Sequence, residues 1–271
     1  MIAVIGLGSD SVLAYFAEYL LQQNQDCVFL NQNELGSNLR INSQGFTLQS
    51  KVFKWSDISV VYSRIHGVVD DELSFESLID LGFLHAWLDH LCPKVINKPR
   101  LTLSNDAKWY QLECLDLKLL KKPISYMGAN TYHPCNNQWV YKSASSVRSK
   151  VSNVKKRGEW VSEPVLFQEH LKGDNVRVHV VGDKLHAMRI YSSAIDYRYC
   201  DQRSMSPTQL PKQIQEECFK VAKQLELIFC GIDLVDTETG WYLLEVNPQP
   251  GYPFFDEPKH SISQLLYKVL I

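Results

Sequence analysis

The chain has 271 residues, of which 45% are hydrophobic and 21% are charged, and its formal net charge is −2. These values are typical of a globular protein with two or three packed units, and they argue against a general affinity for nucleic acids or membrane surfaces. The chain has no basic start, no apolar run near the roughly 20 residues that span a bilayer, and no CxxC pair among seven cysteines, which predicts a soluble cytoplasmic protein with reduced thiols.

The first 97 residues predict a small α/β domain. The opening stretch IAVIGLG is an apolar run that ends in glycines, and residues 10–23 follow with the spacing of a helix. Its two glycines suggest a dinucleotide-binding turn, but Ser11 stands where that motif requires a third glycine, so a tight turn is the favoured interpretation. Further elements are expected downstream: strands over 27–31, 58–65 and 94–97, and a long helix over 71–91.

From residue 98 the pattern changes to that of an α+β protein. A helix is expected over 104–120, with Ser104 as its cap, and we divide this part into two subdomains, 98–168 and 169–271. Alternating patterns predict strands over 138–143, 165–171, 175–181, 184–191, 231–236 and 241–247. Two more helices are expected, over 211–226 and 262–270.

Three oxygen-bearing side chains interrupt the last two of these strands: Asp233, Glu245 and Asn247. Gly240 ends a short polar stretch and predicts a hairpin, and a loop over 238–240 places Asp233 opposite Glu245. Glu245 and Asn247 are two apart on one strand, so they share a face. Two carboxylates and an amide oxygen suit Mg²⁺, with Mn²⁺ as an alternative, whereas a single acidic residue in a strand more often lies on the solvent face.

With this signature the sequence resembles the ATP-grasp carboxylate–amine ligases, in particular the glutathione-synthetase-like branch that includes the microviridin peptide ligases. GIDLVD and YLLEVNP resemble the metal-binding strands of that family, NDAKWYQL the helix with the first nucleotide-binding lysine, and WVYKS the strand with the second. VLFQEHLKGDNVRVHVV resembles the hinge strand and its continuation. The resemblance implies an ATP-grasp fold, with an N-terminal α/β domain and two α+β subdomains that clasp ATP.

The resemblance also implies site residues. Contacts with the nucleotide are implied for Lys108, Lys142, Gln168, Glu169, His170, Leu171 and Asp174. Asp233, Glu245 and Asn247 are implied to hold Mg²⁺, and Arg177 to lie over the γ-phosphate. Arg189 and Arg198, from MRIYSSAIDYR, are candidates for binding an acyl phosphate or a substrate carboxylate. Taken singly, each of these lysines and arginines is more often a solvated surface residue. Residues 143–150, SASSVRSK, depart from the glycine-rich loop usual in the family.

The implied activity is ATP-dependent ligation. A carboxylate is activated as an acyl phosphate and is then attacked by an amine, with release of ADP and phosphate. The expected partners are a small-molecule or peptide acid and amine, with neither nucleic acid nor membrane, and homo-oligomerisation is left open. Two alternatives stay open as well: a nucleotide-binding module without catalysis, and a phosphotransferase that uses the same site.

Overall fold

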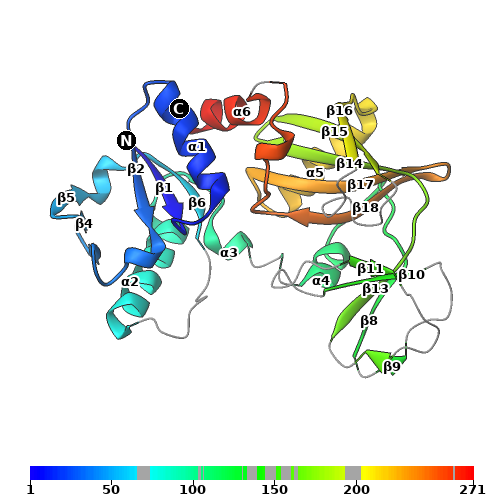
Figure 1. The fold of residues 1–271 in the computed structure, drawn as a ribbon, viewed down its shortest axis with the longest axis horizontal. Helices are drawn as coiled ribbons and strands as arrows, with labels where there is room; N and C mark the ends of the chain where they lie inside the picture. The colour runs from blue at the N-terminus through cyan, green and yellow to red at the C-terminus, as the bar shows by residue number, and fades with distance from the viewer. Residues whose placement is uncertain are drawn as a thin grey trace. The chain divides into compact units, whose positions relative to one another are not determined.

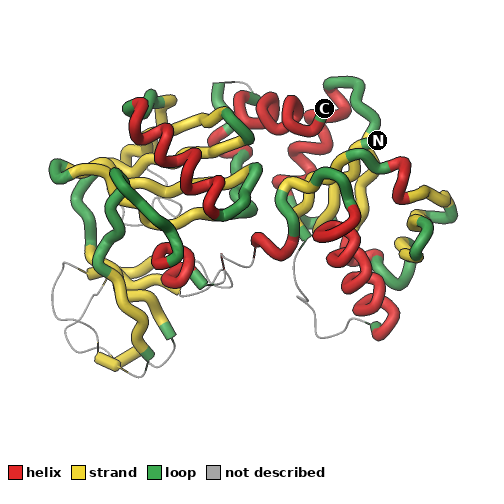
Figure 2. The backbone as a smooth tube through the Cα atoms, turned by 180° about the vertical axis from the view of Figure 1, so that it is seen from behind, coloured by secondary structure: helices red, strands yellow, loops and turns green. Residues whose placement is uncertain are grey.

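The computed structural model describes eleven stretches of the chain: 1–65, 74–102, 105, 107–129, 131–132, 139–143, 151–153, 160–161, 164–192, 203–258 and 260–271. These stretches form two compact units, one of residues 1–102 with 251–271 and one of residues 103–250 (Figures 1 and 2). The predicted domain boundaries, after residues 97 and 168, stay a prediction. In the described part of the chain, none of the helices has the length and apolarity that a bilayer crossing requires.

The first unit is built on a four-stranded parallel sheet in the order β2-β1-β6-β7. Its strands are β1 (Ile2–Gly6), β2 (Cys27–Asn31), β6 (Val60–Arg64) and β7 (Val95–Ile96). Helix α1 (Ser11–Gln22) packs on β1 and β2, and Asp10 caps it by accepting a hydrogen bond of 2.9 Å from the backbone N of Val12. The predicted strand–turn–helix opening is therefore confirmed.

A small antiparallel sheet, β3-β4-β5, is present where no element was predicted. Its strands are β3 (Leu39–Asn42), β4 (Gly45–Leu48) and β5 (Lys51–Lys54). Phe46 and Phe53 stack across it with ring centroids 4.9 Å apart. Helix α2 (Phe75–Ala86) begins at a Ser74 cap and continues as a π-helical turn over Trp87–Leu91, which confirms a helix over most of the predicted range.

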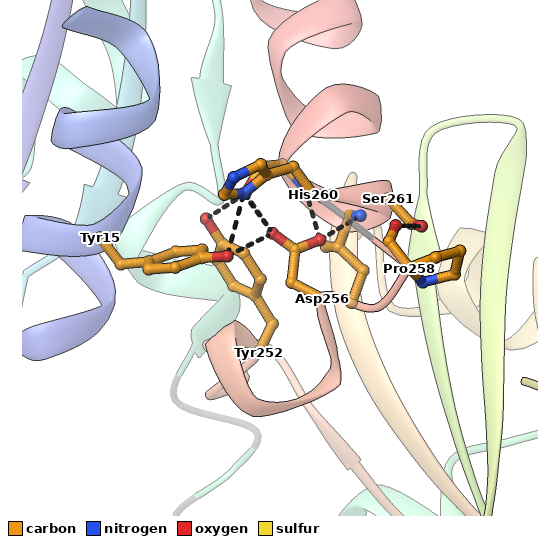
Figure 3. A network of polar contacts seen from close by, with 8 residues as sticks. Tyr15, Tyr252, Asp256, Pro258, His260 and Ser261 are labelled. Carbon is orange, nitrogen blue, oxygen red and sulfur yellow. Dashed lines mark hydrogen bonds and ion pairs between the residues drawn. The ribbon is translucent and has the colours of Figure 1, made fainter. Parts of the chain in front are cut away.

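The chain returns to the first unit at residue 251, and this last segment contains helix α6 (Ser261–Leu270). Figure 3 shows the polar network at its start, around the buried carboxylate of Asp256. That carboxylate accepts hydrogen bonds from the hydroxyls of Tyr15 (3.1 Å) and Ser263 (2.6 Å) and from the backbone N of Ile262 (2.5 Å). Burial, and then the charge of Asp256, raise the pKa of Tyr15 to about 12. The network ties α6 to α1.

The second unit contains a smaller four-stranded sheet and a larger five-stranded sheet. The smaller sheet has the order β11-β10-β13-β8 and is antiparallel throughout. Its strands are β8 (Ser125–Gly128), β10 (Trp139–Ser143), β11 (Val151–Asn153) and β13 (Val165–Glu169). A separate strand pair is formed by β9 (Thr131–Tyr132) and β12 (Trp160–Val161). A short helix, α3 (Pro99–Thr102), ends the first unit before this region.

Helix α4 (Lys108–Glu113) is shorter than the predicted helix over 104–120, and the Ser104 cap lies outside the described residues. The chain after α4 is held in an irregular path by helix α5 (Lys212–Gln224). The side chain of Gln224 bonds both backbone groups of Asp116, at 2.8 and 3.0 Å, and that of Glu217 accepts from the backbone N of Lys118 at 2.6 Å. These tertiary bonds replace the helical ones that the sequence pattern predicts.

The larger sheet is antiparallel, in the order β16-β15-β14-β17-β18. Its strands are β14 (Asp174–Val181), β15 (Lys184–Ser192), β16 (Arg203–Pro207), β17 (Phe229–Thr237) and β18 (Gly240–Asn247). Helix α5 packs on β14 and β17, and Cys218 on α5 lies near Cys230 on β17. The sheet therefore has one face covered by α5, and the opposite face carries the groups described next.

Candidate functional site

The two carboxylates predicted to lie together do so, at the β17–β18 ladder. Asp233 is the direct cross-strand partner of Glu245, although the turn between the strands is not the predicted 238–240 loop. Thr237 pairs with Gly240, so the turn holds only two residues, and Gly240 has the expected positive φ of +124°. A bulge at Leu244 then takes up one residue of β18 and returns Glu245 to the position opposite Asp233.

Asn247 lies two residues beyond Glu245, opposite Gly231 on β17. Its side-chain oxygen accepts a hydrogen bond of 2.9 Å from the backbone N of Gln249, which orients the amide. The side chains of Asp233 and Glu245 are 19% and 17% exposed, so the carboxylates are shielded but reachable from one face of the sheet. The predicted juxtaposition of three oxygen-bearing groups is therefore present.

Lys108 brings the first positive charge to this face. It begins α4, its side chain is 7% exposed, and its Nζ lies 3.0 Å from Oε2 of Glu245. One turn later, the side-chain amide of Gln111 accepts from the backbone N of Val246 (2.9 Å) and donates to its carbonyl (2.7 Å). Because Val246 follows Glu245 directly, this pair of bonds fixes α4 at the strand that carries the carboxylate. Gln111 was not predicted from the sequence, where its only signal is its place three residues after the candidate Lys108, one helical turn away.

Arg177 brings the second positive charge. It lies on β14 opposite Asp233, it is buried, and its Nη1 is 2.8 Å from Oδ1 of Asp233. Its Nε lies 3.4 Å from Nε2 of His179, which shares the same strand face. Two carboxylates on neighbouring strands repel each other, and the two cations offset that repulsion. Four groups of balanced charge therefore converge at one place.

The predicted adenine-side residues lie on the smaller sheet. Lys142 on β10 and Gln168 on β13 are both buried. Gln168 pairs with Val140 across the two strands, and Val140 is two residues before Lys142, so Lys142 and Gln168 lie on the same face of the sheet. Gln168 donates a hydrogen bond of 3.1 Å to the hydroxyl of Ser125. Glu169 lies on the other face and accepts from the backbone N of Ile124 at 2.9 Å. His170 and Leu171 follow directly after β13, with the first side chain exposed and the second half-buried.

Arg189 and Asp174 are not brought to the carboxylate pair. Arg189 on β15 faces Val176, so it points to the sheet face opposite Arg177. There its guanidinium bridges Asp174 (2.6 Å) and Asp236 (2.9 Å), two aspartates that face each other across β14 and β17. These contacts raise the pKa of Arg189 above its ordinary value, with the hydrogen bond to Asp236 as the largest cause. Arg198 and most of the serine-rich stretch 143–150 lie outside the described residues.

The donor set suits a hard divalent cation. No group of three or more His, Cys, Asp and Glu side chains within the described stretches is arranged to hold a metal ion. The candidate set has two carboxylates and one amide oxygen, and Mg²⁺ is commonly bound by one or two carboxylates, with waters and substrate phosphates completing its shell. Asp233, Glu245 and Asn247 therefore fit a cation that arrives with a phosphate-bearing partner.

Several known proteins resemble this chain. The probable alpha-L-glutamate ligase of Vibrio vulnificus (strain YJ016) is 27% identical over 108 residues, which are 38% of this chain and 36% of that protein. The probable alpha-L-glutamate ligase of Psychromonas ingrahamii is 34% identical over 93 residues, 32% of this chain and 31% of that protein. The chain spans about a third of the length of the curated relatives it matches.

The fold is similar to that of solved structures along nearly the whole chain. The macrocyclase MdnC bound with precursor peptide MdnA, from Microcystis aeruginosa MRC, is 17% identical with a TM-score of 0.76, covering 100% of this chain and 99% of that chain. That similarity confirms the predicted fold. The ATP-grasp domain model matches residues 105–252, more than half of the sequence, and this chain therefore belongs to the ATP-grasp family.

Proposed function

We propose that the protein is an ATP-dependent carboxylate–amine ligase. The observation that carries the proposal is the convergence of Lys108 on Glu245 and of Arg177 on Asp233 at one face of an ATP-grasp domain. A paired set of buried cations and shielded carboxylates is costly to assemble, and it suits a ligand that brings both phosphate charge and a metal ion. This chemistry is the binding of a nucleoside triphosphate with Mg²⁺.

The nucleotide is held by two groups of residues in this proposal. On the smaller sheet, Lys142 and Gln168, with the backbone of His170 and Leu171, bind the adenine and the α-phosphate. The side chain of Glu169 lies on the other face of that sheet, so we give it no contact with the nucleotide. On the larger sheet, Lys108 acts as a point charge for the phosphates, and Arg177 offers its forked donors to the γ-phosphate. The cation, Mg²⁺ or alternatively Mn²⁺, is held by Asp233, Glu245 and Asn247, and it supplies charge neutralisation at the phosphate oxygens.

The reaction requires transfer of the γ-phosphoryl group. A carboxylate oxygen of the acid attacks the γ-phosphorus, the bond to the β-phosphate oxygen breaks, and ADP leaves. The amine then attacks the carbonyl carbon, phosphate leaves with the former carboxylate oxygen, and the amine loses a proton. Arg177 stabilises negative charge that develops on the transferred group, and Lys108 keeps the phosphates in line with the acid.

Two predicted residues, Arg189 and Asp174, have other positions in this scheme. Arg189 and Asp174 lie on the opposite sheet face and bind each other, so we give them no part in the transfer step. Their predicted contacts with the substrate carboxylate and the ribose therefore find no support in these ion pairs. Arg198 remains a candidate for binding the substrate carboxylate, on the resemblance alone.

We propose a peptide as the acid, the amine or both. Support comes from the names of similar proteins, because MdnC is bound to a precursor peptide and the probable alpha-L-glutamate ligases are named for an amino acid. A cytoplasmic location is proposed with it. All five cysteines that the structure describes are free thiols, which agrees with a reducing compartment.

The test is ADP release from ATP and Mg²⁺ in the presence of panels of acids, amines and short peptides, with the products followed by mass spectrometry. A ligase forms an amide only when acid and amine are both present. A phosphotransferase accumulates a phosphorylated product without an amine, and a binding module binds ATP but releases no ADP with any pair. Either of the last two results would replace the proposed function.

A further inference from the structure

Gly231 is an unusual residue for its position in the sheet. It lies in the interior of β17, between His179 on β14 and Asn247 on β18. Glycine in a strand interior is destabilising relative to alanine, because it loses more backbone conformational freedom on folding. Its φ lies outside the left-handed region, so the backbone conformation there is open to any residue. The reason for a glycine must therefore be space.

The space above Gly231 is filled by Arg177. A Cβ atom added to Gly231 would lie 2.3 Å from Nη2, 2.5 Å from Cζ and 2.9 Å from Nε of Arg177, and these are its three nearest atoms. The guanidinium thus lies directly on the glycine backbone. From that position Nη1 of Arg177 lies 2.8 Å from Oδ1 of Asp233. Asp233 is two residues after Gly231, so both lie on the same face of β17.

We propose that Gly231 is a positioning residue for Arg177, and that its missing side chain fixes where the positive charge lies beside Asp233 and Asn247. This inference rests on the proposed function, in which Arg177 acts on the γ-phosphate. Any side chain at position 231 lifts the guanidinium off the sheet. Arg177 keeps its positive charge in such a variant, but the guanidinium moves, because the atoms that would clash are at the far end of its flexible side chain.

This distinction gives a sharp test with four proteins: wild type, Gly231→Ala, Arg177→Ala and the double variant. Calorimetry measures the binding of Mg²⁺ with ADP and of Mg²⁺ with the ATP analogue AMP-PNP, and a melting curve is recorded for each. Gly82→Ala is the matched control, because an added Cβ there has no atom within 4 Å. We expect it to match wild type in both affinities and to melt at the same or a slightly higher temperature, because Gly82 lies within helix α2, where alanine is favoured over glycine.

Gly231→Ala is expected to weaken AMP-PNP binding about tenfold or more, as expected for the loss of one charge-assisted contact, and ADP binding much less. In the Arg177→Ala background, the same substitution is expected to change neither affinity further, because the group that it displaces is gone. If Gly231→Ala lowers the melting temperature strongly, the double variant should recover it, since Arg177→Ala empties the space.

Other results overturn the inference. If Arg177→Ala discriminates between the two nucleotides but Gly231→Ala binds both like wild type, the positioning role is wrong and the proposed function stands. If the two substitutions weaken binding additively, or if Arg177→Ala does not restore folding to an unstable Gly231→Ala, then Gly231 has a separate structural role. If Arg177→Ala binds both nucleotides like wild type, Arg177 makes no contact with the γ-phosphate in the bound nucleotide, and the inference fails, whereas its role in the transfer step is decided by kcat.

Discussion

The two faces of the larger sheet carry similar residues in different arrangements. On one face, Arg177 has a side chain that is 7% exposed and pairs with Asp233, next to the Lys108–Glu245 pair. On the other face, Arg189 has a side chain that is 20% exposed and bridges two aspartates, of which Asp174 is 54% exposed. Both are arginine–aspartate contacts of under 3 Å, so the presence of an ion pair does not identify a site.

The two faces differ in how buried their charged groups are and in which charges they bring together. Asp174 and Asp236 face each other across two strands, and their carboxylates repel each other. Because both are partly exposed, water already weakens this repulsion, and Arg189 offsets the rest. The other face gathers two cations and two carboxylates in a shielded place, where charges interact more strongly and need partners. We infer that the Arg189 contacts hold the sheet together, and that the Arg177 face is arranged for a charged ligand.

The largest effect is expected from the carboxylates of the Arg177 face. Asp233→Asn and Glu245→Gln remove charge without volume, so each should lower Mg²⁺-dependent ADP release by a factor on the order of 10² to 10³. Both variants should still fold, with lower melting temperatures, because each removes the carboxylate charge opposite a buried cation. Assays over a range of Mg²⁺ concentrations check this, and near-normal rates in both variants would remove the metal assignment.

Arg177→Met and Arg189→Met compare the faces directly. Arg177→Met should lower kcat by a factor on the order of 10² with a smaller change in ATP affinity, because its contribution is to the transition state. Arg189→Met should leave kcat within about twofold and cost less than about 1 kcal/mol of stability, as for partly exposed ion pairs. Steady-state rates with denaturant melts measure both. The reverse pattern would exchange the roles of the two faces.

The lysines should affect binding more than rate. Lys108→Ala and Lys142→Ala are each expected to weaken ATP binding by about 1–3 kcal/mol, the loss of a charge-assisted contact. Calorimetry with ATP and Mg²⁺ checks this. Unchanged affinity in both variants would place the nucleotide elsewhere.

Gln111 and Gln224 offer a matched pair for the support of the site. Each side chain bonds both backbone groups of one residue, Gln111 at Val246 and Gln224 at Asp116. Gln111→Leu should raise the Mg²⁺ concentration for half-maximal ADP release about three- to tenfold, because it frees α4 and unpairs buried groups that cost about 1–3 kcal/mol. Gln224→Leu should leave that concentration unchanged. Equal effects from both would indicate a general loss of stability.

The smallest effect concerns the thiols beneath the sheet. Burial raises the pKa of Cys218 and of Cys230 to about 12, so both stay protonated at pH 8 in the folded protein. Cys114 is exposed. Brief labelling with iodoacetamide and peptide mapping should modify Cys114 and spare the other two until the protein is unfolded. Cys230 lies on the same face of the sheet as Arg189, and α5 covers it there. Early modification of Cys230 would therefore mean that α5 does not shield this face from solvent.

Much of the site was predictable from local pattern. The carboxylate pair follows from a hairpin glycine and strand alternation, but the sequence suggested a three-residue loop. The structure reaches the same pairing with a shorter turn and a bulge at Leu244. Leu244 follows another leucine, Leu243, so nothing in the local pattern marks the bulge. The turn is one residue shorter than predicted and the bulge adds one residue, and these two differences cancel.

The placement of Arg189 had a usable signal that was missed. Gly182 and Asp183 form a two-residue turn that pairs Val181 with Lys184. Counting back along both strands places Met188 opposite Arg177, which leaves Arg189 on the other face. By contrast, the early end of α4 depends on bonds to α5, about 100 residues away, and no local pattern contains them.

The most direct test of the account is a crystal structure with AMP-PNP and Mn²⁺, with the ion located by its anomalous scattering. We expect Mn²⁺ within about 2.2 Å of oxygens of Asp233 and Glu245, with the triphosphate beside Lys108 and Arg177. Mn²⁺ bound instead between Asp174 and Asp236, or a triphosphate far from the β17–β18 carboxylates, would contradict it.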